Sequence, residues 1–148
     1  MNRRTAVAGV LSLTTGLALT ACSSDSVPQL EVTGAFMPQP VSDMAAGFLH
    51  VKNSGATTDR LTSVTSTLSD HVSIHETENS TMRMVTSFEV PAGGELDLER
   101  GGNHIMFTEL KQRPKRGETV SVELHFEKAD PITVDIPVKE TTYNPKKQ

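Results

Sequence analysis

Short segments in which apolar and polar residues alternate constrain this chain more than any other sequence feature. The two clearest lie at residues 119–126 and 132–138, where every second residue is apolar. Such alternation is typical of a strand that buries one face. No segment beyond the N-terminal region has the spacing of an amphipathic helix. Many short strands in a chain of 148 residues predict a single all-β domain, either a sandwich or a barrel.

Turn residues divide the rest of the chain into further short strands. Asn53-Ser54-Gly55, Asn79-Ser80 and Pro91-Ala92-Gly93-Gly94 are sequences that favour chain reversal. The residues between them predict strands, whereas residues 34–40 are expected to bend into a loop. The expected strands are 30–33, 45–52, 60–68, 72–77, 81–85, 88–90 and 95–99.

The N-terminal residues have the features of a secretory signal. Arg3 and Arg4 precede an apolar run at residues 6–21 that is short and rich in Gly, Ser and Thr for a membrane span. The run ends in Leu-Thr-Ala before Cys22, which resembles the bacterial lipobox, whose cysteine is acylated. We therefore expect a lipoprotein signal peptide at residues 1–21, then lipidated Cys22 and a flexible tether at residues 22–29. The alternatives are an ordinary signal peptide with a chance cysteine, or an N-terminal anchor helix.

The remaining sequence predicts one β domain at residues 30–139 and a polar C-terminal tail at residues 140–148. The formal net charge of −4 argues against nucleic-acid binding. Cys22 is the only cysteine, so the β domain has no disulfide, no thiolate metal ligand and no cysteine nucleophile. The sequence contains no Gly-rich phosphate loop and no serine-nucleophile motif, and we expect a protein that is not an enzyme.

A histidine and a methionine share the outward face of one predicted strand. After the turn at residues 101–103, Ile105 and Phe107 are expected to face the core, which places His104 and Met106 on the opposite side. A methionine usually fills gaps in a core, and the expected position of Met106 does not fit that role.

A second histidine and two more methionines lie in a predicted hairpin. If the turn Asn79-Ser80 forms its loop, His75 pairs with Met84 and Thr77 pairs with Met82. The two methionines are an even number of positions from the apolar residues at 88 and 90, so one unbroken strand would place all four side chains on the same face. The methionines therefore either point inward or are turned outward by a bulge.

Two imidazoles and one or two thioethers form a donor set for a soft cation. This set favours Cu(I) over Zn(II), Mg(II) or Ca(II), and without a cysteine it does not match a blue-copper electron-transfer centre. The other methionines, Met37 and Met44, are expected to be core or loop residues. His50 and His125 have no evident partner in the sequence and are expected to be structural or surface residues. Glu76 is expected either to support the neighbouring imidazole or to keep the surface soluble.

An ordered set of motifs resembles the periplasmic CuA-type copper chaperones, the PCuAC family. The resemblance extends from about Leu30 to Val138. It includes AAGFLHVKNSG (45–55), DRL (59–61), IHET (74–77), MRM (82–84), PAGG (91–94), GGNHIM (101–106), LK (110–111) and FEKA (126–129). His-x-Met alone is a weak signal, whereas the ordered set is specific. The resemblance implies a cupredoxin-like Greek-key β-sandwich or barrel that binds one Cu(I) through a His…Met…His-x-Met motif.

The family pattern assigns the ligands with one disagreement. The family's spacing from its methionine to the second histidine selects Met82, whereas the spacing from its first histidine to the methionine selects His71. The local match Ile-His-Glu-Thr instead selects His75, which the hairpin register pairs with Met84. The candidate ligands are therefore His75, His104 and Met106, with Met82 and Met84 as alternatives for the remaining position and His71 in reserve.

The resemblance implies a metallochaperone that passes Cu(I) by ligand exchange at a shallow, exposed site. Its implied partner is the apo CuA subunit of cytochrome c oxidase or another copper acceptor. We expect a monomer outside the cytoplasm, lipid-anchored to the outer face of the bacterial cell membrane or periplasmic. The family's tail is often rich in His and Met, which residues 141–148 lack, so no second copper site is expected. Alternatives are a copper-buffering lipoprotein and a metal-free β-sandwich lipoprotein that binds another protein.

Overall fold

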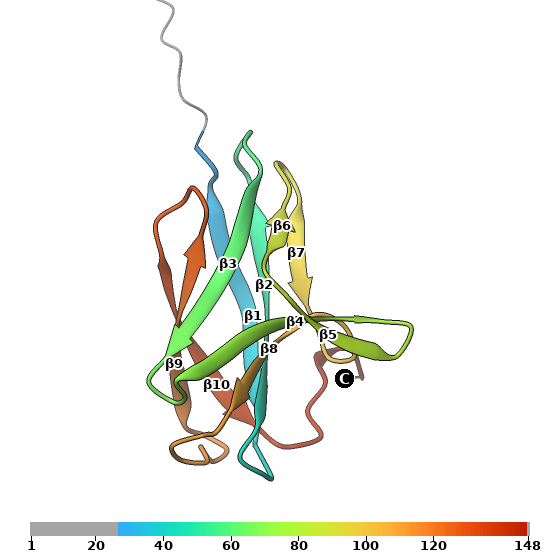
Figure 1. Ribbon diagram of the computed structural model, residues 1–148, viewed down its shortest axis with the longest axis vertical. Coiled ribbons are helices and arrows are strands. Elements are labelled where there is room, and N and C mark those ends of the chain that lie inside the picture. The colour runs from blue at the N-terminus through green and yellow to red at the C-terminus, as the bar shows by residue number, and fades with distance from the viewer. Residues whose placement is uncertain (1–26, 148) are drawn as a thin grey trace, which may run out of the picture.

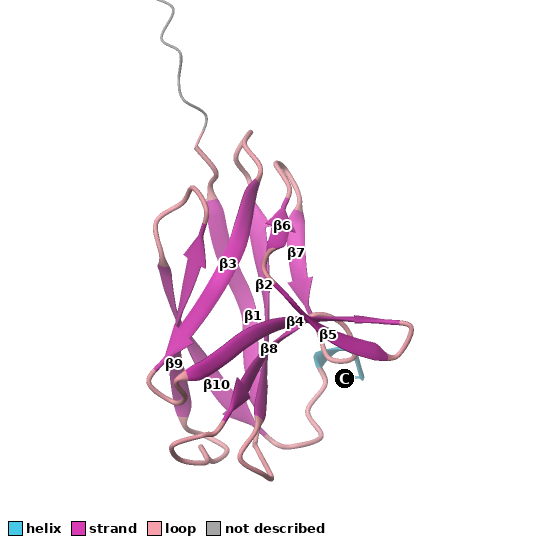
Figure 2. Ribbon diagram, in the orientation of Figure 1, coloured by secondary structure: helices cyan, strands magenta, loops and turns pink. Residues whose placement is uncertain are grey.

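The computed structural model describes residues 27–147, which form β-strands and one short 3-10 helix (Figures 1 and 2). The all-β prediction is therefore confirmed. The predicted signal peptide, the predicted lipidation site Cys22 and most of the predicted tether lie outside the described residues. Within the described part of the chain, no helix has the length and apolarity needed to cross a membrane. The elements are β1 (Leu30–Pro38), β2 (Ala45–Asn53), β3 (Asp59–Ser66), β4 (His71–Glu78), β5 (Thr81–Val85), β6 (Phe88–Val90), β7 (Glu95–Leu98), β8 (His104–Thr108), β9 (Thr119–Phe126), β10 (Ile132–Lys139) and η1 (Pro145–Lys147).

The strands form two groups that are joined by one parallel pairing. One group has the order β5-β4-β8-β2-β1 and the other the order β10-β9-β3-β6. β1 and β10 join them through the parallel pairs Met37–Val138 and Pro38–Lys139. β8 pairs with the first half of β2 and β7 with its second half, so β7 and β8 follow one another along the same strand edge.

The core consists of the apolar residues that alternate along these strands. Leu49, Leu61, Leu124, Ile105 and Phe107 are each 0% exposed. Complete burial of such a side chain stabilises the fold by roughly 1.5–3 kcal/mol. The inward face of β8 is therefore fixed by Ile105 and Phe107, as predicted, and its other residues must project from the opposite face.

β1 is longer than the sequence predicts. The segment predicted as a loop continues the strand through a register shift between Thr33 and Phe36. Gly34 has φ 63°, a conformation that glycine adopts at little cost, so the shift bends the strand without ending it. Phe36 and Met37 consequently reach the core, whereas Met44 lies in the β1–β2 loop and is 52% exposed.

The β4–β5 hairpin extends sideways beyond the rest of the molecule (Figure 1). Asn79 and Ser80 form its two-residue turn with φ angles of 50° and 63°. Positive φ at both turn residues gives a twist that matches the flanking strands. The register pairs Thr77 with Met82, which confirms the predicted hairpin pairing.

The break between β5 and β6 resolves the orientation of the hairpin methionines. β5 ends at Val85 and β6 begins at Phe88, and the two strands lie at opposite edges of the strand order. The alternation of faces along β5 therefore does not continue into β6. Met82 and Met84 are 51% and 69% exposed and do not join the core.

Candidate metal centre

Strand pairing brings the five candidate ligands to one face of three adjacent strands. His75 of β4 pairs with Met84 of β5 on one side and with His104 of β8 on the other. Directly paired residues project to the same side of a sheet, as do residues two apart along a strand. Met82 and Met106 are each two residues from one of these paired residues. They therefore project to the same side.

His104 has one ring nitrogen directed at a methionine sulfur. Its Nδ1 lies 2.9 Å from the carbonyl oxygen of Gly102. Because a carbonyl oxygen only accepts, this hydrogen bond assigns the proton to Nδ1 and leaves a lone pair on Nε2 of the neutral ring. That Nε2 lies 3.1 Å from Sδ of Met82. Two facing lone pairs do not attract one another, but a soft cation bound to both stabilises the arrangement.

The site has a buried imidazole side and an exposed thioether side. His104 is only 8% exposed, and its ring centroid lies 6.4 Å from that of Phe48. The sequence-based expectation of a shallow, exposed site therefore holds for the methionines of β5 and not for this histidine. Of the methionines in residues 27–147, Met82 is the one whose sulfur lies within hydrogen-bonding distance of a histidine nitrogen.

His75 lies beside His104 as a neutral ring. The two ring centroids are 5.6 Å apart and the ring planes differ by 23°. Nε2 of His75 lies 2.9 Å from Oγ of Ser73, whereas its buried Nδ1 has no hydrogen-bond partner. Burial lowers the pKa of His75 below its ordinary value, and the repulsion that arises if both rings are protonated makes a smaller contribution. The neutral imidazole is the form that binds a metal.

Without copper, the protein is expected to lose stability as the pH falls below about 6.5, the ordinary pKa of histidine. Because the pKa of His75 is lowered in the folded state, the unfolded chain binds a proton more readily. The stability is fully present above the unfolded-state pKa and is lost as the pH falls toward the folded-state pKa. Thermal unfolding at about pH 7.5 and about pH 5 should therefore show a smaller decrease in Tm for His75→Gln than for the unaltered protein. An equal decrease in the two proteins contradicts this assignment.

His71 and Glu76, which were also considered from the sequence, lie away from the candidate ligands. His71 pairs with Thr108 and its Nε2 lies 3.3 Å from Oε2 of Glu109. It is four residues from His75 along β4, or roughly 13 Å at the usual strand rise. Glu76 projects to the other face of β4, where it forms an ion pair with Arg83. Glu76 therefore does not contact the neighbouring imidazole.

His50 is a structural or surface residue, as predicted, and it has a partner that the sequence does not indicate. Its Nδ1 lies 2.6 Å from Oδ1 of Asp97, the residue paired with it across β2 and β7. His50, Asp97 and Glu99 lie close enough to share a metal ion. The carboxylate of Asp97 is nevertheless occupied by His50, and that of Glu99 forms an ion pair with Lys146. This group is therefore a charge-paired surface cluster.

His125 also has cross-strand and same-strand partners. Its Nε2 lies 3.0 Å from Oγ1 of Thr65 on β3 and 3.2 Å from Oε1 of Glu123. These contacts support its predicted role as a structural or surface residue. Neither His50 nor His125 has a sequence signal for its partner, because each partner depends on strand pairing.

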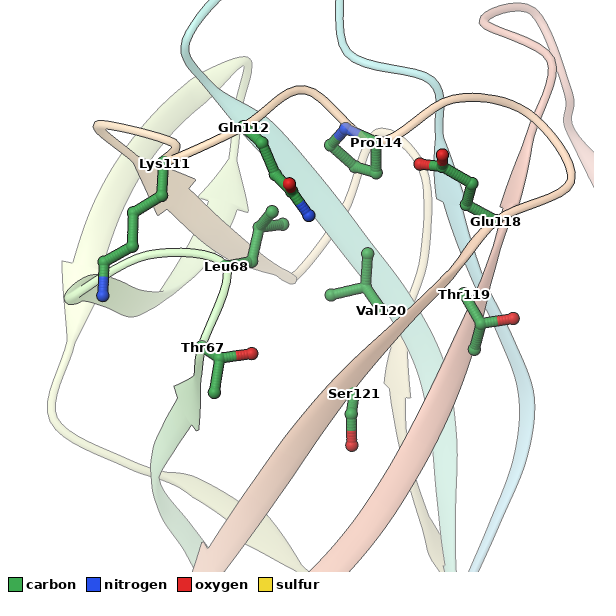
Figure 3. Close-up of a pocket in the computed structure, with 9 residues that line it drawn as sticks. All are labelled: Thr67, Leu68, Lys111, Gln112, Pro114, Glu118, Thr119, Val120 and Ser121. Atoms are coloured by element: carbon green, nitrogen blue, oxygen red, sulfur yellow. The ribbon is translucent and has the colours of Figure 1, made fainter.

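An open groove of about 480 Å³ lies elsewhere on the molecule (Figure 3). Its walls come from the turn after β3, the loop after β8 and the first half of β9. Lys111 at its margin forms an ion pair with Asp70 over 2.7 Å, and this contact lowers the pKa of the Asp70 carboxyl. None of the candidate ligands lines this groove.

Several solved structures share this fold. The apo PCuAC domain of PmoF2 has a TM-score of 0.70 and 21% identity, with 80% of this chain and 96% of that domain covered. The copper-bound PCuAC domain from PmoF2 has a TM-score of 0.68 and 22% identity, with 78% and 96% covered. Apo-DR1885 from Deinococcus radiodurans has a TM-score of 0.61 and 25% identity, with 95% and 98% covered. The likeness confirms the predicted cupredoxin-like fold of PCuAC domains.

Sequence relatives identify the family. A curated relative, "Putative lipoprotein Lxx21020" of Leifsonia xyli subsp. xyli, is 34% identical over 148 residues, covering 93% of this chain and 89% of that protein. The family model described as "Putative lipoprotein LpqE-like" matches residues 18–138, which include all five candidate ligands. The chain thus belongs to the LpqE-like lipoprotein family, and its β domain has the fold of PCuAC domains.

Proposed function

We propose that this protein is a Cu(I)-binding metallochaperone. The observation that carries the proposal is the convergence of His104 Nε2 and Met82 Sδ at 3.1 Å, beside the ring of His75 on the adjacent strand. His75, His104 and Met82 are the proposed principal ligands. Met106, on the same face, is the further donor, and Met84 is the alternative to Met82.

The donor set suits transient binding of Cu(I). Imidazole and thioether groups are neutral donors, so the ion is held without a thiolate charge. The thioether side of the site is exposed, with Met82 and Met84 at 51% and 69%. An incoming donor can therefore approach the ion from the hairpin and replace the ligands one at a time.

The solved structures support the choice of metal. Two similar solved structures are copper-bound forms: the PCuAC domain from PmoF2 and CuI-DR1885 from Deinococcus radiodurans. At 22% and 24% identity, these proteins share the fold with this chain. The donor set of this chain supplies the chemical reason to extend copper binding to it.

The proposal also covers the protein's cellular location and the acceptor of its copper. The lipobox resemblance at Cys22 and the LpqE-like lipoprotein family support a lipid-anchored protein outside the cytoplasm. The resemblance to CuA-type chaperones favours the apo CuA subunit of cytochrome c oxidase as the acceptor. Loss of oxidase assembly after gene deletion, restored by the intact gene, is the expected result. Altered copper tolerance with normal oxidase assembly instead indicates a copper-buffering protein.

Replacing Met82 with leucine is expected to lower the Cu(I) affinity by at least about tenfold, or about 1.4 kcal/mol. Leucine keeps a similar volume and removes the sulfur that faces His104. Met84→Leu is the matched control on the same strand and should change the affinity less than about threefold. The measurement is competition with a Cu(I) chelator under reducing conditions. Absence of Cu(I) retention by the unaltered protein refutes the proposed function, and equal effects of the two variants refute the ligand assignment.

A further inference from the structure

The C-terminal segment, residues 140–147, packs against the loop that carries His104 into the site. The sequence indicates a polar tail here, yet Figure 1 shows the chain after β10 turning back along the domain. Arg100 Nη1 donates a hydrogen bond of 3.1 Å to the carbonyl oxygen of Tyr143. The ammonium group of Lys146 forms an ion pair with the carboxylate of Glu99. Two polar contacts therefore join the segment to residues 99 and 100.

The same segment contributes an aromatic ring to a series that ends at His104. The ring of Tyr143 meets that of Phe36 edge-on, with a centroid distance of 5.0 Å and an interplanar angle of 76°. Phe36 lies 5.1 Å from Phe48, and Phe48 lies 6.4 Å from His104 between ring centroids. Phe36 and Phe48 are each only 5% exposed. Tyr143 thus lies against the aromatic pair that backs the buried imidazole.

The turn at residues 99–102, which precedes β8, sets the orientation of the His104 ring. Gly102 N donates to the carbonyl oxygen of Glu99 over 2.8 Å, which closes a turn. The carbonyl oxygen of Gly102 then accepts the proton of His104 Nδ1. This hydrogen bond leaves Nε2 free to face Met82. The contacts of the C-terminal segment with Glu99 and Arg100 therefore lie at the start of the turn that selects the His104 tautomer.

We propose that the C-terminal segment positions His104 for copper, with Tyr143 as the principal positioning residue. The inference rests on the proposed Cu(I) function and adds to it a part of the chain that contains no candidate ligand. The segment acts from two sides. Its polar contacts hold the turn at residues 99–102, and the Tyr143 ring supports the aromatic wall behind the imidazole. Groups that orient a ligand in this way contribute to metal affinity without touching the metal.

The test compares Tyr143→Ala with Tyr143→Phe. Alanine removes the ring that contacts Phe36, whereas phenylalanine keeps it. Tyr143→Ala should lower the Cu(I) affinity by about tenfold and Tyr143→Phe by less than about twofold. In the metal-free protein, the ¹⁵N shifts of the His104 ring should move toward mixed tautomers in Tyr143→Ala and stay unchanged in Tyr143→Phe.

A control separates positioning from general stability. Phe126→Ala removes another partly buried aromatic side chain, which pairs with Leu61 on β3. At a temperature where every variant is folded, it should leave both the Cu(I) affinity and the His104 shifts unchanged. If Tyr143→Ala does not fold, Arg100→Met carries the test with the same readouts, because it removes the donor to the Tyr143 carbonyl.

The two proposals fail in different ways. Unchanged affinity and unchanged His104 shifts in Tyr143→Ala overturn the positioning role, even if the unaltered protein binds Cu(I). Absence of Cu(I) binding by the unaltered protein overturns the proposed function. In that case the ¹⁵N shifts of the metal-free variants still test whether Tyr143 orients His104.

Discussion

Replacing His104 with glutamine is expected to lower the Cu(I) affinity by at least about 100-fold. Loss of a group that hydrogen-bonds to a metal ligand typically lowers the metal affinity by about 10–100-fold, and loss of a directly bound donor should lower it more. His104 is the ligand with the most restricted geometry, because Gly102 fixes its Nδ1 and Nε2 faces Met82. Glutamine retains a polar side chain in the buried position but provides no imidazole lone pair for a soft ion. Chelator competition measures the change in affinity.

His71→Gln is the matched control for this prediction. His71 lies on the same face of β4 as His75 but pairs with Thr108, and its Nε2 lies 3.3 Å from Oε2 of Glu109. Its replacement should change the Cu(I) affinity by less than about twofold. A large effect of His71→Gln with little effect of His104→Gln would reverse the ligand assignment. It would also favour His71, the first histidine that the family's spacing selects.

Replacing Asn53 with aspartate is expected to destabilise the protein by about 3–5 kcal/mol at neutral pH. Asn53 is 0% exposed and uses both ends of its amide. Its Oδ1 accepts from the backbone N–H groups of Gln29 and Gly55, at 3.1 and 3.0 Å. Its Nδ2 donates to the carbonyl oxygens of Thr57 and Val90, at 2.8 and 3.2 Å. Aspartate keeps the acceptor but directs a buried negative charge at two carbonyl oxygens.

Urea unfolding at about pH 7 measures this loss, and Asn79→Asp is its control. Asn79→Asp makes the same chemical change at an exposed turn residue. It should change the free energy of unfolding by no more than about 0.5 kcal/mol. Burial raises the pKa of a carboxyl group, so the carboxyl introduced in place of the Asn53 amide should bind a proton more readily in the folded state. The destabilisation should therefore decrease as the pH falls toward about 4. Similar free energies of unfolding for the two variants would show that the Asn53 hydrogen bonds contribute little.

Local sequence determined most of the strands, although not the full length of β1, and the two faces of β8. The period of two requires Ile105 and Phe107 to face the core together, so His104 and Met106 must face the other way. The turn Asn79-Ser80 fixes the hairpin register in the same local manner, because a two-residue loop determines which residues pair. These parts were predictable because each depends on residues that are close in the chain.

Only the tertiary structure decided which side chains meet and how deeply each is buried. Pairing of β4 with β8 brings His75 beside His104 and leaves His71 outside, a choice on which the sequence patterns disagreed. The same non-local packing directs Met82 at His104, gives His50 its carboxylate partner and folds the C-terminal segment against residues 99 and 100. Alternation along a strand specifies a face, but it contains no information on which distant strand lies alongside. The donor types were therefore set by the sequence alone, whereas their convergence depends on strand order and packing.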